Sequence, residues 1–523
     1  MERADHPPSG GWAPAAAVFA TAALLLVWFH GNYLVFSLDE GILLDAGQRA
    51  LGGARPYVDF FTYMGPGSIW LQELALRLFG ITLRSGRLVV IFDCALQCAL
   101  LWWLTARLAS RAAAWAAVVL YFLLQMSQPA LLTPQHRWDS AALSLASVAL
   151  CLEGYWRRRR AWWFAGGALA VAAASCTAPV AWIGAVTGTW ILARPELRRF
   201  FRDYAAGGAG AGAVLLAGLL GTGTLRGYLA QSAWAGAHYT GVNSMSYGAI
   251  NGGYRAVLAG PHDLLGVRLA VVLCLALPAV LPILGVAGCT AEILARPKRE
   301  TAPGQPPLAY LAACLAAYVA TTYPRPDVSH LAFVAPLGYV LAARTLTKVL
   351  PPAAGVAAFA LVFMCALAPA SFTAAGVVTA QRVESPAGTL RVPGPSAEGV
   401  RRLLAMVRPG DGLYVHPYCP LLYFLTQAHN PTRYSYLNPG MMTARDEQAT
   451  LADLARDPPD WVLYFDLSRA EFLRVFPGGK GLDHRFHALE DWLARNYAPV
   501  EPPVSAAGYQ LWTRRSAGSR SAD

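Results

Sequence analysis

The chain has 523 residues, of which 55% are hydrophobic and only 14% are charged, and its mean hydropathy is +0.38. Soluble domains contain about 45–50% apolar residues, so this composition excludes an ordinary soluble protein and predicts a polytopic α-helical membrane protein. The net charge of +11 is interpreted as a topology signal, because many basic residues gather at the ends of apolar segments. We therefore expect membrane lipid, and no nucleic acid, as a partner.

Eleven apolar segments are predicted to span the membrane, the short ones with tilt or partial re-entry. The first is longer than the apolar region of a secretory signal and is followed by no small-residue cleavage site, so we expect a retained anchor. Basic residues concentrate at 157–160, 194–202 and 296–299, and the positive-inside rule assigns these loops to the cytoplasm. The spans are expected at 13–35, 86–108, 112–132, 139–156, 161–175, 178–193, 204–222, 266–294, 308–323, 328–345 and 352–373.

The segment that follows the first span, FSLDEGILLDAGQRALGGARPYVDFFTYMGPGSIW (36–70), combines acidic and aromatic residues at a membrane edge. Asp39 and Glu40 have a simple structural explanation, since acidic residues favour the first turn of a helix and Asp is a common cap. The alternative is that a site at the membrane face uses them.

A turn is predicted at SCTAPV (175–180). Basic clusters flank residues 161–193 on both sides, so both ends should be cytoplasmic, although one continuous helix of this length would extend for about 50 Å. Pro179 and its small neighbours favour a reversal there and two short helices.

Three more polar segments are expected on the outward side. They are 133–140 with His136, Arg137 and Asp139, 238–255 with several Gly and Tyr, and 323–330 with Arg325 and His330. Each alone is explained by a local ion pair, a flexible loop or a turn. Together they favour a functional site, because ionisable groups at a membrane face are costly unless they serve one.

The pattern changes after residue 373. Helices are predicted at 397–407, 448–457 and 484–497, and strands at 411–416, 459–468 and 509–514. We therefore divide the chain into a transmembrane module, 1–373, and an α/β domain, 374–523, which the odd number of spans places outside the cytoplasm. Eight of the nine cysteines lie in or beside predicted spans, and no metal-binding spacing of Cys and His occurs.

The order of an N-terminal span, the sequence DEG, the loop GGARPYVDFFTYMGPGSIWLQELALRLFG and a following Arg resembles bacterial members of the GT-C glycosyltransferase superfamily. That group includes protein mannosyltransferases, aminoarabinose transferases and lipopolysaccharide-core transferases. YPRPDVSHLAFVAPLGYVLAA resembles their late periplasmic loop and the span after it, and RPGDGLYVHPYCPLLYFLTQ resembles their terminal soluble domain. The resemblance covers nearly the whole chain. It implies a multi-pass protein of the bacterial cytoplasmic membrane, with a polyprenyl-phosphate sugar as donor and a glycan, lipid or protein as acceptor.

The resemblance also implies that Asp39 is the catalytic base, with Glu40 beside it, and that Asp139 is a second acidic residue of the site. In such a reaction a carboxylate takes the proton of the acceptor hydroxyl while the polyprenyl phosphate leaves with its negative charge. Arg49, Arg55 or Arg137 is expected to pair with Asp39 and keep it ionised. The outward loops between the spans hold no Lys, so the phosphate must be bound by Arg and His, for which Arg137, Arg325 and His330 are predicted.

The other candidates for donor or acceptor binding are His136, Tyr57 and Asp59. Tyr57, Tyr63 and Trp70 either stack on a sugar or anchor an interfacial helix, and the second interpretation is favoured. No cofactor is certain, and the sequence leaves the need for a divalent cation open. Three other functions fit a membrane protein of this kind: a polysaccharide polymerase or ligase, a lipid-linked sugar transporter, and a non-catalytic assembly protein. A transporter would carry charges near the middle of the membrane, where Asp93 is the main example here.

Overall fold

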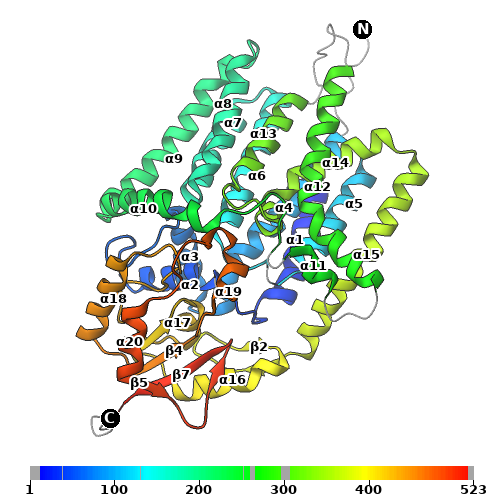
Figure 1. Ribbon diagram of the computed structural model, residues 1–523. Coiled ribbons are helices and arrows are strands. Elements are labelled where there is room, and N and C mark those ends of the chain that lie inside the picture. The colour runs from blue at the N-terminus through cyan, green and yellow to red at the C-terminus, as the bar shows by residue number, and fades with distance from the viewer. Residues whose placement is uncertain are drawn as a thin grey trace, which may run out of the picture.

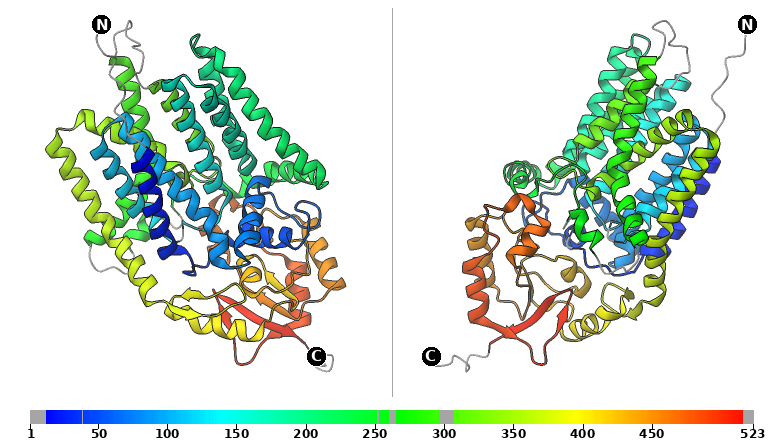
Figure 2. Two further views of the ribbon diagram at one scale, coloured as in Figure 1. Left: turned by 180° about the vertical axis from the view of Figure 1, so that it is seen from behind. Right: turned by 45° about the vertical axis from the view of Figure 1, so that its right-hand side comes forward.

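A computed structural model shows a bundle of long helices joined to a C-terminal α/β domain, with a layer of short helices between them (Figure 1). The structure describes residues 12–37, 39–129, 131–250, 253–259, 265–295 and 307–515. The basic residues expected at 296–299 lie outside this description. In all three views the α/β domain packs against one end of the bundle (Figure 2).

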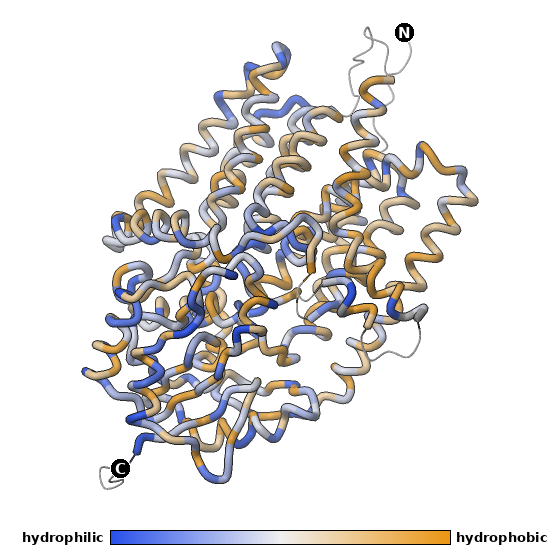
Figure 3. Tube along the Cα trace, in the orientation of Figure 1, coloured by the Kyte–Doolittle hydropathy of each residue, from blue (hydrophilic) through white to orange (hydrophobic). Residues whose placement is uncertain are grey.

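Each of the eleven predicted spans coincides with helix in the structure. Five helical segments are long and apolar enough to cross a membrane by length and composition: Trp12–His30, Leu83–Leu108, Arg198–Gly221, Arg268–Ala295 and Pro352–Thr379. Hydrophobic residues follow the long helices, and hydrophilic ones concentrate in the α/β domain (Figure 3). The fold is therefore that of a polytopic membrane protein. The bundle helices are α1 (Trp12–His30), α4 (Leu83–Leu108), α5 (Arg111–Tyr121) with the π-helix η1 (Phe122–Met126), α6 (His136–Arg157), α7 (Arg160–Cys176), α8 (Ala181–Ala193), α9 (Phe201–Gly221), α12 (Leu265–Ala295), α13 (Leu308–Ala320), α14 (Val328–Val349) and α15 (Pro352–Thr379).

The reversal predicted near residue 177 is confirmed. Helix α7 ends at Cys176, a single 3-10 turn, η2 (Ala178–Val180), follows, and α8 begins at Ala181. The turn lies at the end of the bundle nearer the α/β domain, and it contacts the first loop. A Cβ on Gly65 would lie 2.2 Å from the carbonyl oxygen of Ser175, so only glycine permits this approach.

The layer between bundle and α/β domain consists of helices α2 (Glu40–Leu51), α3 (Pro66–Phe79), α10 (Leu225–Asn243) and α11 (Gly253–Leu258). Helix α10 crosses the ends of α7, α8 and α9 (Figure 1), and it occupies part of the segment that was expected to be a loop at 238–255. Helices α2 and α3 pack with the C-terminal domain, since Leu44 and Leu76 share a buried cluster with Leu413 and Leu421. Residues assigned by sequence to the transmembrane module therefore also build the core of the α/β domain.

The α/β domain begins after α15, which continues past the expected boundary to Thr379. All six predicted elements are present as α16 (Gly394–Met406), β3 (Leu413–His416), α18 (Ala444–Arg456), β4 (Trp461–Tyr464), α20 (His487–Asn496) and β7 (Tyr509–Arg514). The main sheet has the order β3-β4-β7-β5, with β6 paired to β7, and only β3 and β4 run parallel. The elements that were not expected are β1 (Gln381–Val383), β2 (Leu390–Val392), α17 (Leu421–Thr426), α19 (Arg469–Val475), η4 (Pro477–Gly479), β5 (Tyr497–Pro499) and β6 (Ser505–Ala506).

A buried ion pair joins helices α1, α2 and α4. Arg87, near the start of α4, binds both carboxylate oxygens of Glu40, with Nε–Oε1 at 2.6 Å and Nη2–Oε2 at 2.9 Å. Its Nη1 donates to the carbonyl oxygens of His30 and Tyr33 at the end of α1. Both side chains are excluded from solvent, at 2% and 0% exposure. Such a pair holds the end of α1 and the start of α2 against α4, because each charge is satisfied only in this arrangement.

We expect Glu40→Gln to lower stability strongly, because it leaves the Arg87 charge buried without its carboxylate, at a cost of about 3–5 kcal/mol. The measurement is the midpoint of thermal unfolding in detergent. The matched control is Glu73→Gln, which removes the carboxylate of the more exposed Arg77–Glu73 pair on α3 and should cost less than about 1 kcal/mol. Equal midpoints for the two variants would contradict a structural role for Glu40.

Candidate active site

A cavity of about 350 Å³ lies where the bundle, the first loop and α10 meet. It contains four of the side chains selected from the sequence: Asp39, His136, Arg137 and His330. The turn at 176–179 forms another part of its wall, as do Tyr63 and Gly65 of the first loop. Five segments that are far apart in the sequence thus enclose one space.

Asp39 is the N-cap residue of α2, but its side chain makes no capping hydrogen bond. The explanation of this carboxylate as a helix cap is therefore not supported by its geometry. Asp39 is exposed on the side that faces the cavity, and protein surrounds its carboxylate on the other sides. Desolvation raises the pKa of Asp39, the charges of Arg325 and Arg137 act in the opposite direction, and Asp327 adds to the rise.

Arg137 and His330 supply cationic or hydrogen-bonding groups to the cavity. Nη1 of Arg137 donates to the carbonyl oxygen of Thr321 at 3.3 Å, which directs the guanidinium along the cavity wall. In His330, Nδ1–H donates to Oδ1 of Asp327 at 2.7 Å, so Nε2 is the ring nitrogen that Asp327 does not engage. Arrangements in which a carboxylate orients an imidazole in this way fix its tautomer and direction.

Arg325 does not line the cavity but supports it. Its Nε donates to Oδ2 of Asp327 at 2.8 Å and its Nη2 to the carbonyl oxygen of Val475 at 3.0 Å. Asp327 in turn caps α14 by accepting the backbone N–H of His330 at 2.9 Å. Although burial raises the pKa of Asp327, the hydrogen bonds and charge of His330 and the bond from Arg325 lower it to about 2. Arg325 therefore connects the α/β domain to the loop that presents His330.

His136 also lines the cavity, and its position depends on the turn between α7 and α8. The hydroxyl of Thr177 donates to the carbonyl oxygen of His136 at 3.1 Å, so the same hydroxyl accepts from Nδ1–H of His136 at 2.7 Å. This reciprocal pair joins the first turn of α6 to the reversal near residue 177.

Four of the other residues selected from the sequence lie outside the cavity. Glu40 is bound to Arg87, and Asp139 is buried in α6 beside Asp93 of α4. Tyr57 is buried, and its hydroxyl donates to the carbonyl oxygen of Met64 at 2.6 Å. Asp59 is exposed and pairs with Arg55 at 3.1 Å.

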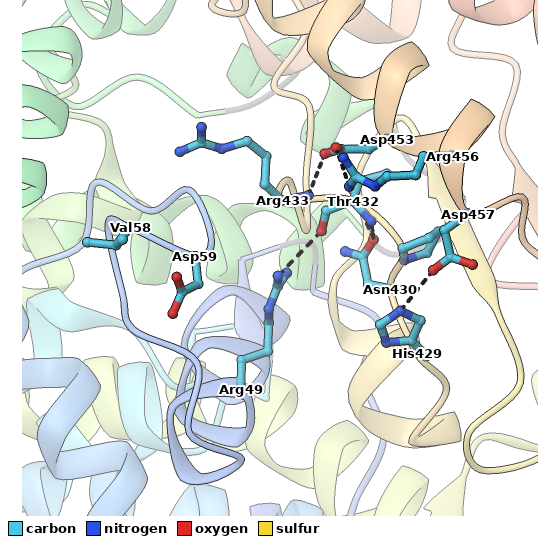
Figure 4. A pocket seen from close by; sticks show the side chains of 11 residues that line it. Arg49, Val58, Asp59, His429, Asn430, Thr432, Arg433, Asp453, Arg456 and Asp457 are labelled. Atoms are coloured by element: carbon cyan, nitrogen blue, oxygen red, sulfur yellow. Dashed lines mark hydrogen bonds and ion pairs between the residues drawn. The ribbon is translucent and has the colours of Figure 1, made fainter.

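Asp59 belongs to a different, shallow pocket of about 440 Å³ between the first loop and the α/β domain (Figure 4). Arg49 also lies there, where its Nη2 donates to the carbonyl oxygen of Thr432 at 3.4 Å. Arg49 and Arg55 are therefore engaged elsewhere, and of the three expected partners of Asp39 only Arg137 shares its cavity.

The sequence did not single out Arg87, Asp327 or α10, although each contributes to the site. Asp327 had a visible signal, since an Asp directly before a helical run is a common N-cap. The four-residue spacing of Tyr228, Ser232 and Gly236 is typical of one face of a helix. Among the described residues, no group of three or more His, Cys, Asp and Glu is placed to hold a metal ion, and the need for a divalent cation, which the sequence left open, is not decided by this observation.

No protein-family model and no curated protein sequence matches the chain. Solved structures match by fold. A crystal structure of ArnT from Cupriavidus metallidurans bound to undecaprenyl phosphate has a TM-score of 0.54 at 14% identity, over 97% of this chain and 99% of that one. The Archaeoglobus fulgidus oligosaccharyltransferase in its apo form has a TM-score of 0.50 at 13% identity, over 86% of this chain and 69% of that one. The chain therefore shares the fold of these proteins, as the resemblance of its first loop to the GT-C superfamily implied.

Asp327→Ala should lower the thermal midpoint markedly, because it removes the cap of α14, at about 1 kcal/mol, and a carboxylate facing Arg325. Asp327→Asn keeps an oxygen for the cap and should recover part of the loss. The folded-state pKa near 2 lies below the usual value of about 3.9, so the charge stabilises the fold at neutral pH and this contribution fades as the pH falls from about 4 through 2. The exposed Asp491→Ala is the control, and equal midpoints for both alanine variants would exclude this role.

Proposed function

We propose that the chain is a membrane glycosyltransferase that moves a sugar from a polyprenyl-phosphate donor to an envelope acceptor at the outer side of the bacterial cytoplasmic membrane, with Asp39 as general base. The observation that carries the proposal is the cavity that Asp39 lines together with Arg137 and His330, with an Asp39 side chain that makes no capping hydrogen bond. The likeness in fold to ArnT, whose structure holds undecaprenyl phosphate, supports a lipid-phosphate donor.

The residues divide the chemistry between them. The acceptor oxygen forms a bond to the anomeric carbon, its proton passes to Asp39, and the bond from that carbon to the phosphate oxygen breaks with the electron pair staying on the phosphate. A carboxylate with a raised pKa is a stronger base than an ordinary one, and the opposing charges of Arg137 and Arg325 favour the ionised form. Arg137 and His330 bind the leaving phosphate, with Arg325 acting through Asp327.

The position of the cavity fits this donor. Figure 3 shows apolar long helices on one side of the layer that contains α2, α3 and α10, and a more hydrophilic α/β domain on the other. The cavity is lined by residues of this layer and by the adjoining ends of the bundle helices, so a lipid tail can remain in the membrane while the sugar is in the aqueous part. Glycan, lipid and protein acceptors are all compatible with it. We assign Glu40 a structural role, because both oxygens of its carboxylate accept hydrogen bonds from Arg87.

Asp39→Asn should reduce transfer by about 10²–10⁴-fold, because the amide cannot accept the proton, while its shape and its ability to cap a helix are preserved. Transfer is measured in membranes with native lipid donor, at protein levels matched by immunoblot. Asp491→Asn, an exposed position on α20, is the control. Wild-type turnover by Asp39→Asn at equal abundance would remove Asp39 from the mechanism and leave the assembly, polymerase and transporter alternatives.

The orientation is proposed from the basic loops and the odd number of spans, which put the α/β domain outside the cytoplasm. Alkaline phosphatase fused after Asp523 should therefore be active, and green fluorescent protein fused at the same position and exported by the same route should stay dark. Bright fluorescence with inactive phosphatase would reverse the orientation and move Asp39 to the cytoplasmic side.

A further inference from the structure

The cavity has two chemically different walls. The first loop, α6 and α14 contribute the charged and ionisable side chains of Asp39, His136, Arg137 and His330. Helix α10 contributes six residues with no charge among them: Tyr228, Ser232, Ala235, Gly236, Tyr239 and Thr240. We call these six residues the α10 wall.

The α10 wall is one face of a helix. Its members recur at intervals of three and four residues, which brings side chains to the same side of an α-helix. Ser232 and Gly236 are exposed to the cavity between the two tyrosines. A Cβ placed on Gly236 would meet no atom within 4 Å, so the space beside it belongs to the cavity.

The first loop holds this helix in place. Gln231, which is buried, accepts the backbone N–H of Thr62 and donates to the carbonyl oxygen of Tyr57, both at 2.8 Å. Gly227 packs so closely that a Cβ there would lie 2.6 Å from the same carbonyl oxygen. The α10 wall is therefore fixed in place by contacts to the first-loop backbone.

The same loop orients the two tyrosines. The Tyr57 ring meets the Tyr228 ring edge to face at 5.3 Å between centroids, and the Tyr63 ring meets the Tyr239 ring at 6.2 Å. Aromatic pairs of this geometry are favourable and hold the rings in defined directions. Ser232 and Gly236 therefore lie between two oriented tyrosines on this face of α10, and we call the part of the cavity beside them the slot.

Hydroxyl groups, tyrosine rings and open space suit a neutral sugar. Sugar hydroxyls are donors and acceptors that Ser, Thr and Tyr can match, and the apolar ring atoms contact aromatic side chains. A cationic amino sugar would need a carboxylate, since a partly desolvated charge is costly without a partner. Among the described lining residues the one carboxylate is Asp39, which the proposed reaction uses as base.

We propose that the α10 wall binds the sugar of the lipid-linked donor, that this sugar is a neutral monosaccharide, and that Gly236 limits its size. The inference rests on the proposed function and adds the substrate class and a residue that determines specificity. The volume of about 350 Å³ is near the lower end of the range of about 300–1,000 Å³ for ligand pockets, which favours one sugar ring with its phosphate over an oligosaccharide.

The test compares Gly236→Leu with Gly241→Leu. Both glycines lie within α10 and have open space at the Cβ, but Gly241 does not line the cavity. Leucine is a better helix former than glycine, so neither change should disrupt the helix. The probes are undecaprenyl phosphate and undecaprenyl phosphate carrying glucose, and the measurement is the dissociation constant for the full chain in nanodiscs.

Gly236→Leu should weaken binding of the glucose-carrying lipid by about 10–100-fold, as expected for a filled pocket, and leave undecaprenyl phosphate nearly unchanged. Gly241→Leu should change neither. Equal weakening of both lipids by Gly236→Leu, or no weakening, overturns the α10 wall. If the wild-type chain binds neither lipid, the proposed function itself fails, and the two failures are thereby distinguished.

The second measurement addresses charge. Undecaprenyl phosphate carrying glucosamine differs from the glucose compound by one amino group in place of a hydroxyl. The wild-type chain should bind the glucose compound at least about tenfold more tightly, because the amino group would enter the slot without a carboxylate to pair with. Equal or tighter binding of the glucosamine compound would overturn the assignment of a neutral sugar.

Discussion

The buried pair of Glu40 and Arg87 is the interaction on which the rest of the site depends. The guanidinium of Arg87 binds a carboxylate at the start of α2 and two carbonyl oxygens at the end of α1, so three helices meet at one charge. Neighbouring residues of a helix point about 100° apart. With Glu40 directed towards α4, the preceding residue, Asp39, is free to face the cavity. The acidic pair in the sequence therefore divides into a structural carboxylate and an accessible one.

All three layers of the fold act on the cavity, although the described residues that line it come from the bundle, the first loop and α10. The bundle supplies Arg137 and His330, the first loop supplies Asp39, and the α/β domain fixes Arg325 through the carbonyl oxygen of Val475. Electrostatic effects are strong in such a place, because protein replaces water around the carboxylate while two guanidinium groups lie within range.

The first loop and the α/β domain form one structural unit. A Cβ on Gly41 would lie 1.8 Å from the backbone nitrogen of Leu421, so α2 and α17 are in direct backbone contact. Helix α2, and with it Asp39, is therefore held from two sides, by Arg87 of the bundle and by α17 of the α/β domain. This coupling gives the C-terminal domain a direct influence on the site, although its charged side chains do not line the cavity among the described residues.

The sequence by itself determined the spans, the turn near residue 177 and the six main elements of the α/β domain, because these depend on local hydrophobicity, proline and alternation. It also selected Asp39, His136, Arg137 and His330, because polar residues next to apolar spans can be recognised without knowing how the spans pack. Only the tertiary structure decided how they combine. The sequence offered Glu40 beside Asp39, and Asp59 as a binding residue, but it could not show that Arg87 pairs with Glu40 and Arg55 with Asp59. Helix α10 has no clear apolar face in its sequence, so its part in the cavity follows from its docking on Thr62 and Tyr57. This contact joins segments more than a hundred residues apart, and no local pattern encodes it.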